Sequence, residues 1–349
     1  MALRRPLLLL FVLALGIAAT ASAQDPAPAP AAPPIATPTA GAPENPIRDL
    51  EAIVVTGMQP GPGLWRVSKG GHVMWVLGTL SPLPRGMQWD SGAIEKAISQ
   101  SQEVLFSPSV EIKTDRGFFG NLVLLPSALK ARRNPDGKRL QDVVTPEQYA
   151  RWQVLKARYI GGDRGIEQWR PVFAALELYD KAIRKSGMSA RGLIGPTVTK
   201  LAKRHGVKVS NPKLTITISQ PRQALKEFAN TSLEDLDCFG KTMDRIETDL
   251  GTMVARANAW AIGDIQTLRE LPYGNQFTTC SAAFSSAALA RKHGVADMAG
   301  QMQNKWLAAA ESALMRNHTT FATLPIAELL KSDGYLARLE AKGYTVEAP

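Results

Sequence analysis

The chain has 349 residues, of which 45% are hydrophobic and 21% charged, with 28 Gly, 24 Pro and a formal net charge of +10. This composition excludes a wholly disordered or fibrous protein, and the length is compatible with two domains or with one large α/β domain. Two cysteines and four histidines exclude a disulfide-rich scaffold and a four-thiolate zinc site, and leave few ways to build any metal site.

The first 23 residues have the pattern of a secretory signal peptide. Arg4 and Arg5 precede an apolar run over 7–19, and Ala21-Ser22-Ala23 supplies a small-residue cleavage site. The apolar run, of about 13 residues, is shorter than the roughly 20 that a membrane-spanning helix needs. We therefore expect cleavage after Ala23 and export to the periplasm or the medium. Loss of two arginines lowers the formal charge of the mature chain from +10 to +8.

Residues 24–46 are rich in proline and alanine. Such a segment forms neither a helix nor a strand ladder and buries little apolar surface, so we expect a disordered linker. The folded domain is expected over 47–349. No later segment of the sequence is long and apolar enough to predict a transmembrane helix.

The domain is expected to begin with short strands. Leu64 to Val67 and His72 to Leu77 flank Lys69-Gly70-Gly71, the pattern of a β-hairpin. A helix over 91–101 and a buried strand over 103–106 follow.

The middle of the chain predicts mainly helices. Thr145-Pro146-Glu147-Gln148 combines a capping box with proline at the first helical position, and a second helix runs from Pro171 to Gly187. Another capping box over 231–234 predicts a long helix through Trp260 to Gly263. The remaining expected helices cover 264–271, 278–291 and 296–316, and the expected strands cover 207–209 and 214–218.

The C-terminal part predicts a strand over 320–324, a helix over 334–341 and a strand over 344–346. Strands therefore cluster at the two ends of the domain and helices fill its middle. This order predicts an α/β fold whose central mixed β-sheet is formed by N- and C-terminal strands and covered by a largely helical middle region.

Two similar segments each contain a histidine. His205 and His293 both follow basic residues and precede Gly206 or Gly294. Cations favour the negative end of a helix, and glycine favours the left-handed residue after it. Both histidines are interpreted as helix ends, because no carboxylate or thiol lies at metal-ligand spacing from either.

Several segments resemble the TraB/GumN family, relatives of the Tiki proteases. The resemblance begins at Leu64-Trp65-Arg66-Val67 and at Val76-Leu77-Gly78-Thr79-Leu80-Ser81, and it continues in Trp260-Ala261-Ile262-Gly263-Asp264. Arg316-Asn317 resembles the family's Arg-Asn pair, and 321–346 resembles its closing strand–helix–strand. The resemblance implies an α/β core with helical insertions in an exported or membrane-associated protein.

The chemistry implied by the family rests on a Gly-x-x-His motif, a glutamate closing the next strand, and a second histidine near the C-terminus. In this chain Ser81, Ser107 and Glu328 stand at those positions, and Met315 replaces a glutamate before Arg316. Two serines and one glutamate are a weak ligand set for a divalent metal, so we expect neither a metal nor another cofactor.

If the resemblance extends to the site, Ser81, Ser107, Arg316 and Glu328 should converge. The positions equivalent to the family's pocket are Gly78, Thr79, Ser81, Ser107, Arg316, Asn317 and Glu328. His318 is the candidate for a remaining base, because it follows Arg316-Asn317 and is expected to approach Glu328. His72 is expected to lie about 20 Å of strand away from Gly78. Serine catalysis is not indicated, because the chain has no Gly-x-Ser-x-Gly elbow.

The two cysteines, Cys238 and Cys280, are expected to pair. An exported chain reaches an oxidising compartment, and an even count of cysteines favours a disulfide over two buried thiols. A redox enzyme is not indicated, because the chain has no C-x-x-C pair. Phosphate-binding and dinucleotide-binding glycine motifs are also missing from the sequence.

The positive charge does not indicate nucleic-acid binding, since basic residues are scattered along the chain and export separates it from cellular nucleic acid. The densest cluster, Lys130 to Arg139, surrounds a predicted turn. The remaining partner that the positive charge suggests is an anionic envelope polymer, to which the protein would adhere.

Three functional hypotheses follow. The first is an exported family member that has lost its catalytic groups and serves as a binding or structural module. The second is a hydrolase, by family analogy a peptidase, that is metal-dependent or uses a relocated site with Glu328, His318 and Arg316. The third is an envelope factor associated with polysaccharide.

Overall fold

The computed structural model describes residues 61–349 except 116–122, 231–234, 272–279 and 281–296. These residues lie in the compact unit Leu50–Pro349. The predicted signal peptide and linker lie outside the described residues. So do the second capping box, His293, and the helix expected over 278–291 apart from Cys280.

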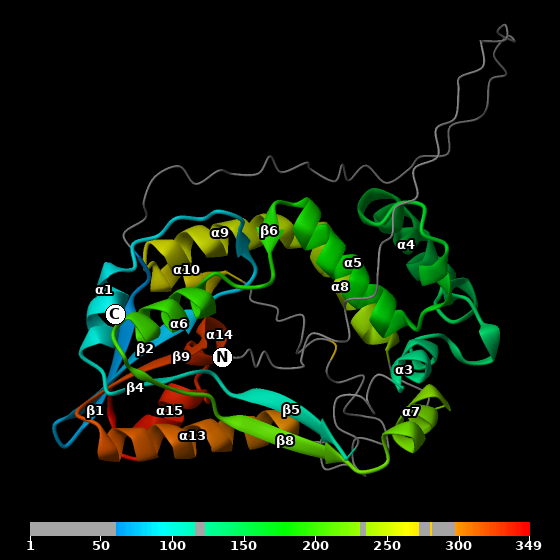
Figure 1. Cartoon of the computed structure of the whole chain (residues 1–349). Coiled ribbons are helices and arrows are strands. Elements are labelled where there is room, and N and C mark those ends of the chain that lie inside the picture. Colours follow the sequence, from blue (N-terminus) through cyan, green and yellow to red (C-terminus); the bar gives the residue numbers. More distant parts are fainter. Residues whose placement is uncertain (1–60, 116–122, 231–234, 272–279, 281–296) are drawn as a thin grey trace, which may run out of the picture. The chain divides into compact units, whose positions relative to one another are not determined.

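One mixed sheet has the strand order β10-β1-β2-β9-β4-β7 (Figure 1). Its strands are β1 (Leu64–Lys69), β2 (His72–Thr79), β4 (Glu103–Leu105), β7 (Lys208–Ser210), β9 (Thr319–Pro325) and β10 (Thr345–Glu347). β1 is antiparallel to both β2 and β10, whereas β2, β9, β4 and β7 run parallel to one another. The predicted fold class is confirmed: N- and C-terminal strands form the sheet, joined at one edge by β7.

The hairpin between β1 and β2 is confirmed with a two-residue turn. Lys69 pairs with His72, and the intervening Gly70 and Gly71 have φ of 57° and 83°. Two successive left-handed residues make a turn whose twist matches that of the strands, and glycine adopts this conformation at least steric cost.

Helices cover both faces of the sheet (Figure 1). α13 packs against β2, β4 and β9 on one face together with α15, whereas α1, α6 and α9 lie on the other. The described α-helices are α1 (Gly92–Ser99), α3 (Leu125–Ala131), α4 (Pro146–Tyr159), α5 (Pro171–Lys185), α6 (Ile194–Arg204), α7 (Pro221–Asn230), α8 (Leu236–Thr248), α9 (Leu250–Ala261), α10 (Ile265–Glu270), α13 (Met298–Arg316), α14 (Ile326–Leu329) and α15 (Tyr335–Glu340). Short 3₁₀ turns occupy Pro135–Gly137, Leu140–Asp142 and Gly165–Gln168.

Two local helix signals act as the sequence predicts. Thr145 accepts a hydrogen bond from the Gln148 backbone N–H, and the Gln148 side chain bonds back to the Thr145 N–H. At the end of α6, His205 is the C-cap and Gly206 has a φ of 66°. Each signal depends only on residues that are neighbours in sequence, which explains why both can be predicted without knowledge of the fold.

The long helix expected to run through Trp260 is interrupted, so that prediction is wrong in its middle. α8 ends at Thr248 and α9 begins at Leu250, with Asp249 between them. The Asp249 carboxylate accepts hydrogen bonds from Arg245 and from both terminal nitrogens of Arg256. These contacts with residues four and seven positions away hold the break, and Gly251 just after it is a weak helix former.

Two smaller sheets complete the described strands. β5 (Ser109–Thr114) pairs parallel with β8 (Lys213–Ile218), and β3 (Leu83–Pro84) pairs antiparallel with β6 (Met188–Ser189). The sequence predicts β8 but not β5, α3 or α7. The β3–β6 pairing matters most for function, because it brings the chain after Ser189 next to the end of β2.

The apolar core has two main clusters. One fills the space between the sheet and its helices and contains Trp65, Trp260, Trp306 and Phe321. The other lies among α4, α5 and α8 and includes both cysteines. Cys238 and Cys280 form a disulfide with Cα atoms 4.8 Å apart, so the predicted pairing is confirmed.

Candidate functional site

A pocket lies at the carboxyl ends of the parallel strands β2, β4 and β9. Open α/β folds commonly bind ligands at this edge, because the loops that follow the strands diverge there. Its cavity volume is ≈ 450 Å³. The pocket, named here the strand-end pocket, is lined by Thr79, Leu80, Ser81, Pro82, Phe106, Ser107, Tyr179, Ala190, Gly192, Ile194, Gly195, Thr323 and Pro325.

Three of the residues expected at the family's pocket meet here: Thr79, Ser81 and Ser107. Thr79 ends β2, and Ser81 and Ser107 each follow a strand by two residues. The Ser107 hydroxyl donates to the Thr323 carbonyl at 2.9 Å, and the Ser81 hydroxyl donates to the Ala190 carbonyl at 3.0 Å. The expectation that the two serines converge is therefore met.

Gly78 precedes Thr79 in β2 and does not itself line the pocket. Its carbonyl accepts a 2.7 Å hydrogen bond from the buried Trp260 indole. A Cβ atom at this position would lie 2.4 Å from Ile326 Cδ1 and 3.2 Å from the Trp65 ring. A side chain at this position would therefore have to displace Ile326, and glycine allows the close packing at the end of β2.

The described lining of the strand-end pocket contains no carboxylate, imidazole or thiol. Across the described residues, no group of three or more His, Cys, Asp or Glu side chains converges as a metal site would require. A divalent cation needs several deprotonated ligands. The hydroxyl groups present do not fit the metal that the family resemblance implies.

Arg316 and Asn317 do not reach this pocket, so the expected convergence fails for them. They precede β9, whereas the pocket lies beyond its other end. Both side chains bind the Glu103 carboxylate, at 3.1 Å from Arg316 and 3.2 Å from Asn317. The pair therefore anchors the amino-terminal edge of the sheet.

Glu103 is buried at the start of β4, with its side chain only 4% exposed. Burial by itself raises the pKa of this carboxyl, but hydrogen bonds from Ser210, Asn317 and Arg316, with the charge of Lys208, outweigh it and hold the pKa below its usual range. The carboxylate thus joins β4 to β7 and to the connection between α13 and β9.

Glu328, the third expected substitution, lies in α14 just beyond β9. Its carboxylate pairs with Lys331, three residues later, and it does not line the strand-end pocket. Burial, and to a smaller extent the charge of Glu328, raise the pKa of Tyr335 to about 12. Glu328 therefore follows the pocket residue Pro325 closely in sequence, but its carboxylate forms its ion pair outside the pocket.

His318 lies at the amino-terminal end of β9, and the expectation that it approaches Glu328 is wrong. The seven residues of β9 separate the two by roughly 20 Å of strand. His318 instead stacks on His72, with ring centroids 5.6 Å apart and planes 4° from parallel. His72 Nδ1 donates to the Asn317 carbonyl at 2.8 Å, so His72 is remote from Ser81, as expected.

Several pocket residues carry no signal in the sequence. Tyr179 comes from the middle of α5, and Ala190 and Gly192 come from the turn after β6. Thr323 belongs to a strand that the sequence does predict, yet only the β4–β9 register places it beside Ser107. Pairings over such sequence separations are invisible to local patterns.

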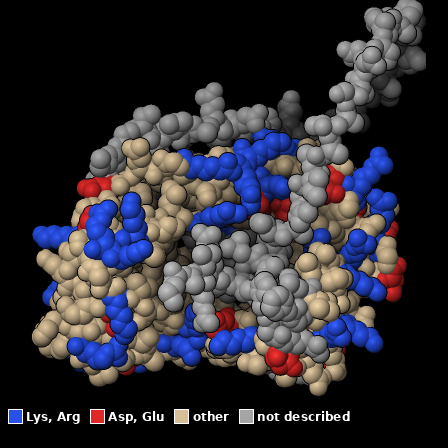
Figure 2. All heavy atoms as spheres, viewed as in Figure 1, with Lys and Arg blue, Asp and Glu red and all other residues tan. Residues whose placement is uncertain are grey.

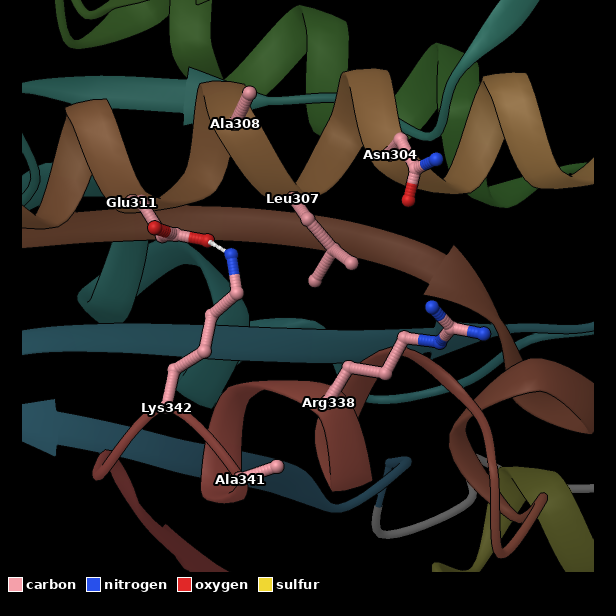
Figure 3. Close-up of a pocket in the computed structure, with 7 residues that line it drawn as sticks. All are labelled: Asn304, Leu307, Ala308, Glu311, Arg338, Ala341 and Lys342. Atoms are coloured by element: carbon pink, nitrogen blue, oxygen red, sulfur yellow. Dashed lines mark hydrogen bonds and ion pairs between the residues drawn. The ribbon is translucent and has the colours of Figure 1, made fainter.

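A second hollow, of ≈ 400 Å³, lies between α13 and the segment around α15 (Figure 3). Figure 3 shows the Lys342–Glu311 ion pair on one side and the Arg338 side chain on the other, with Leu307 between them. None of the residues expected at the family's pocket lines it. We therefore assign the candidate site to the strand-end pocket.

Lys and Arg side chains are spread over the visible face rather than gathered at one place (Figure 2). Many have acidic partners, such as Arg151 with Asp244 and Glu247. Among the described residues, no helix has both the length and the apolar character needed to cross a membrane.

Comparison with known proteins gives one match. Searches of curated proteins and of solved structures found nothing similar to this chain. The family model described as the TraB/PrgY/gumN family matches residues 63–348. This match covers the whole described fold, from β1 to β10, including the strand ends that form the pocket. The chain therefore belongs to the TraB/PrgY/gumN family.

Proposed function

We propose that the protein is an exported, metal-independent binding module that holds an uncharged ligand in the strand-end pocket. The observation that carries this proposal is the pocket's chemistry: hydroxyl groups line it where catalysis would require acids, bases or metal ligands. A serine nucleophile needs an adjacent base. Both serine hydroxyls instead donate to backbone carbonyls, which do not act as bases.

The hydrolase hypothesis receives no support from the arrangement of its residues. Arg316 is bound to Glu103, Glu328 is paired with Lys331, and His318 is stacked on His72. The first and third lie at one end of β9 and the second lies beyond the other end. These three groups do not form a common site.

Filling the pocket should abolish binding without harming the fold. Gly195 lines the pocket within α6, and a Cβ there would meet no atom within 4 Å. We expect Gly195→Leu to weaken the binding of pocket ligands by at least about tenfold, because leucine occupies the cavity. The substitution should not destabilise α6, since leucine is a better helix former than glycine. Ligand-observed NMR with a library of neutral, cationic and anionic fragments measures this.

The matched control is Gly162→Leu, at an exposed loop glycine that also has open space around it. It should leave fragment binding unchanged. Dialysis against a chelator should likewise change neither binding nor thermal stability. Stoichiometric divalent metal in the purified protein, with binding lost when the metal is stripped, would refute metal independence. Fragments that bind equally to Gly195→Leu and to the unaltered protein would refute the pocket.

Export is the second part of the proposal and has its own test. If the signal is cleaved after Ala23, the protein recovered from the periplasm or medium should begin at Gln24. Replacing Ala23 with a bulky residue, as in Ala23→Leu, should block processing, because the peptidase needs small residues there. N-terminal sequencing measures the outcome, and an intact Met1 on the exported protein would contradict it.

The expected charge of +8 after cleavage supports a weaker proposal, adhesion to an anionic envelope polymer. The spread of basic residues in Figure 2 favours diffuse attraction over a shaped polymer site. Co-sedimentation with purified envelope polymer should therefore occur at low salt and disappear near physiological salt. Failure to sediment at low salt would end this proposal.

A further inference from the structure

Three of the hydroxyl groups that line the strand-end pocket have a defined polarity. The Thr79 hydroxyl donates to the Leu324 carbonyl at 3.3 Å, and the Ser81 and Ser107 hydroxyls donate to the carbonyls of Ala190 and Thr323. A hydroxyl has one proton and two lone pairs, and a carbonyl only accepts. In all three residues the proton is therefore used within the protein, and the lone pairs are what each oxygen offers a ligand.

A pocket whose oxygens act as hydrogen-bond acceptors selects a ligand that carries hydrogen-bond donors. Donation to a carbonyl polarises a hydroxyl and makes its oxygen a better acceptor. Thr323, only 1% exposed, already accepts from the Ser107 backbone N–H. The complementary groups on a ligand are O–H or N–H donors spaced to meet several oxygens at once.

The charges around the pocket restrict the class of ligand further. A cation would lack a counter-charge, because no carboxylate is present in the described lining. An anion would face the lone pairs of Thr79, Ser81 and Ser107, and no Lys or Arg in the described lining would balance its charge. Arg191 lies between the lining residues Ala190 and Gly192, but it is exposed and does not itself line the pocket. A neutral ligand avoids both penalties.

Leu80, Phe106 and Ile194 supply apolar surface to the same cavity, beside the Tyr179 ring with its phenol hydroxyl. The ligand therefore needs hydroxyl donors together with a carbon surface. Saccharide rings combine these two features, since ring hydroxyls project around faces that carry C–H groups. Ile194 and Gly195, in the first turn of α6, also line the pocket. Their backbone N–H groups have no partner within the helix and can serve the ligand's oxygens.

We propose that the strand-end pocket binds a neutral saccharide. The sugar's hydroxyl groups donate hydrogen bonds to the side-chain oxygens of Thr79, Ser81 and Ser107. This inference rests on the proposed binding function and specifies its ligand class.

The test uses a matched set of small glycosides with the purified protein. Saturation-transfer NMR is recorded with the methyl glycosides of glucose, galactose, mannose and N-acetylglucosamine, with their fully O-methylated forms, and with methyl glucuronide. At least one neutral glycoside should bind, its O-methylated form should bind at least about tenfold more weakly, and the glucuronide should bind more weakly than glucoside. Loss of two or more accepted hydrogen bonds gives this factor.

Substitutions then locate the oxygens. Ser81→Ala and Ser107→Ala should each lower the affinity for the bound glycoside about fivefold. Ser99→Ala removes a serine hydroxyl that also donates to a carbonyl, on α1 away from the pocket, and should have no effect. The comparison of free and O-methylated sugar needs no variant, so it remains decisive if a serine variant folds poorly.

Two results would overturn the saccharide assignment: no glycoside of the panel binds, or the O-methylated forms bind as well as the free sugars. The fragment experiment with Gly195→Leu separates this failure from failure of the proposed function. If fragments such as primary amides still bind in a Gly195→Leu-sensitive way, the pocket is a binding site for another neutral donor. If no fragment binds either, both proposals fail.

Discussion

Removal of the Cys238–Cys280 disulfide is expected to lower the free energy of unfolding by roughly 3 to 4 kcal/mol. The bond closes a loop with a sequence separation of 42, and much of its effect comes from restricting the unfolded chain. Both cysteines are also buried in the cluster formed by α4, α5 and α8. The double variant Cys238→Ala/Cys280→Ala tests this by urea denaturation at neutral pH.

Reduction provides the control for this variant. A thiol reductant should destabilise the unaltered protein by a similar amount and leave the double variant unchanged, because the variant has no disulfide to lose. A midpoint in urea shared by the variant and the oxidised protein would show that the bond contributes nothing to stability.

Glu103→Gln is expected to destabilise the fold by about 2 kcal/mol at pH 7, since hydrogen bonds to charged groups contribute more than neutral ones. The buried carboxylate accepts from Arg316, Asn317 and Ser210. A glutamine amide retains one acceptor oxygen, carries no charge and places an N–H₂ group against these donors. Arg316 is half exposed, which moderates the loss because water can solvate its guanidinium.

The difference between Glu103→Gln and the unaltered protein should depend on pH. Because the folded-state pKa of Glu103 is lowered, its contribution is fully present above the unfolded value of about 4.3 and is lost as the pH falls through the folded value. Urea denaturation at pH 7 and below pH 4 should therefore show a gap that narrows in acid.

The control for Glu103 is Glu340→Gln on the exposed end of α15, which should change stability by less than about 0.5 kcal/mol. A gap between Glu103→Gln and the unaltered protein that stays constant from pH 7 to pH 3 would contradict the assigned role of the carboxylate. It would indicate that only side-chain shape matters at this position.

Glu103 also explains why the Arg316-Asn317 pair belongs to the scaffold rather than to the pocket. The sequence places this pair a few residues before a predicted strand, and the family resemblance suggests a pocket position. The structure shows that the strand carries the chain away from the pair and delivers Thr323 and Pro325 to the pocket instead. A motif at the start of a strand and one at its end cannot share a site.

The sequence alone determined the features that depend on near neighbours or on covalent chemistry. The Gly70-Gly71 turn, the Thr145 capping box and the helix end at Gly206 each arise from a few adjacent residues. The clustering of strands at the two ends of the domain, with helices between them, predicted the fold class. The expected export and the even number of cysteines predicted the disulfide. These preferences act over a few residues, or through a single bond.

The tertiary structure alone decided which of the chemically interesting residues meet. Thr79 and Pro325 are brought side by side by the parallel β2–β9 register, and the β3–β6 pairing brings Ala190 to Ser81. His72 and His318 stack because His72 begins β2 and His318 immediately precedes β9, the parallel strand beside it. Such pairings join residues more than 100 positions apart, and they are set by the packing of the whole core rather than by any local preference.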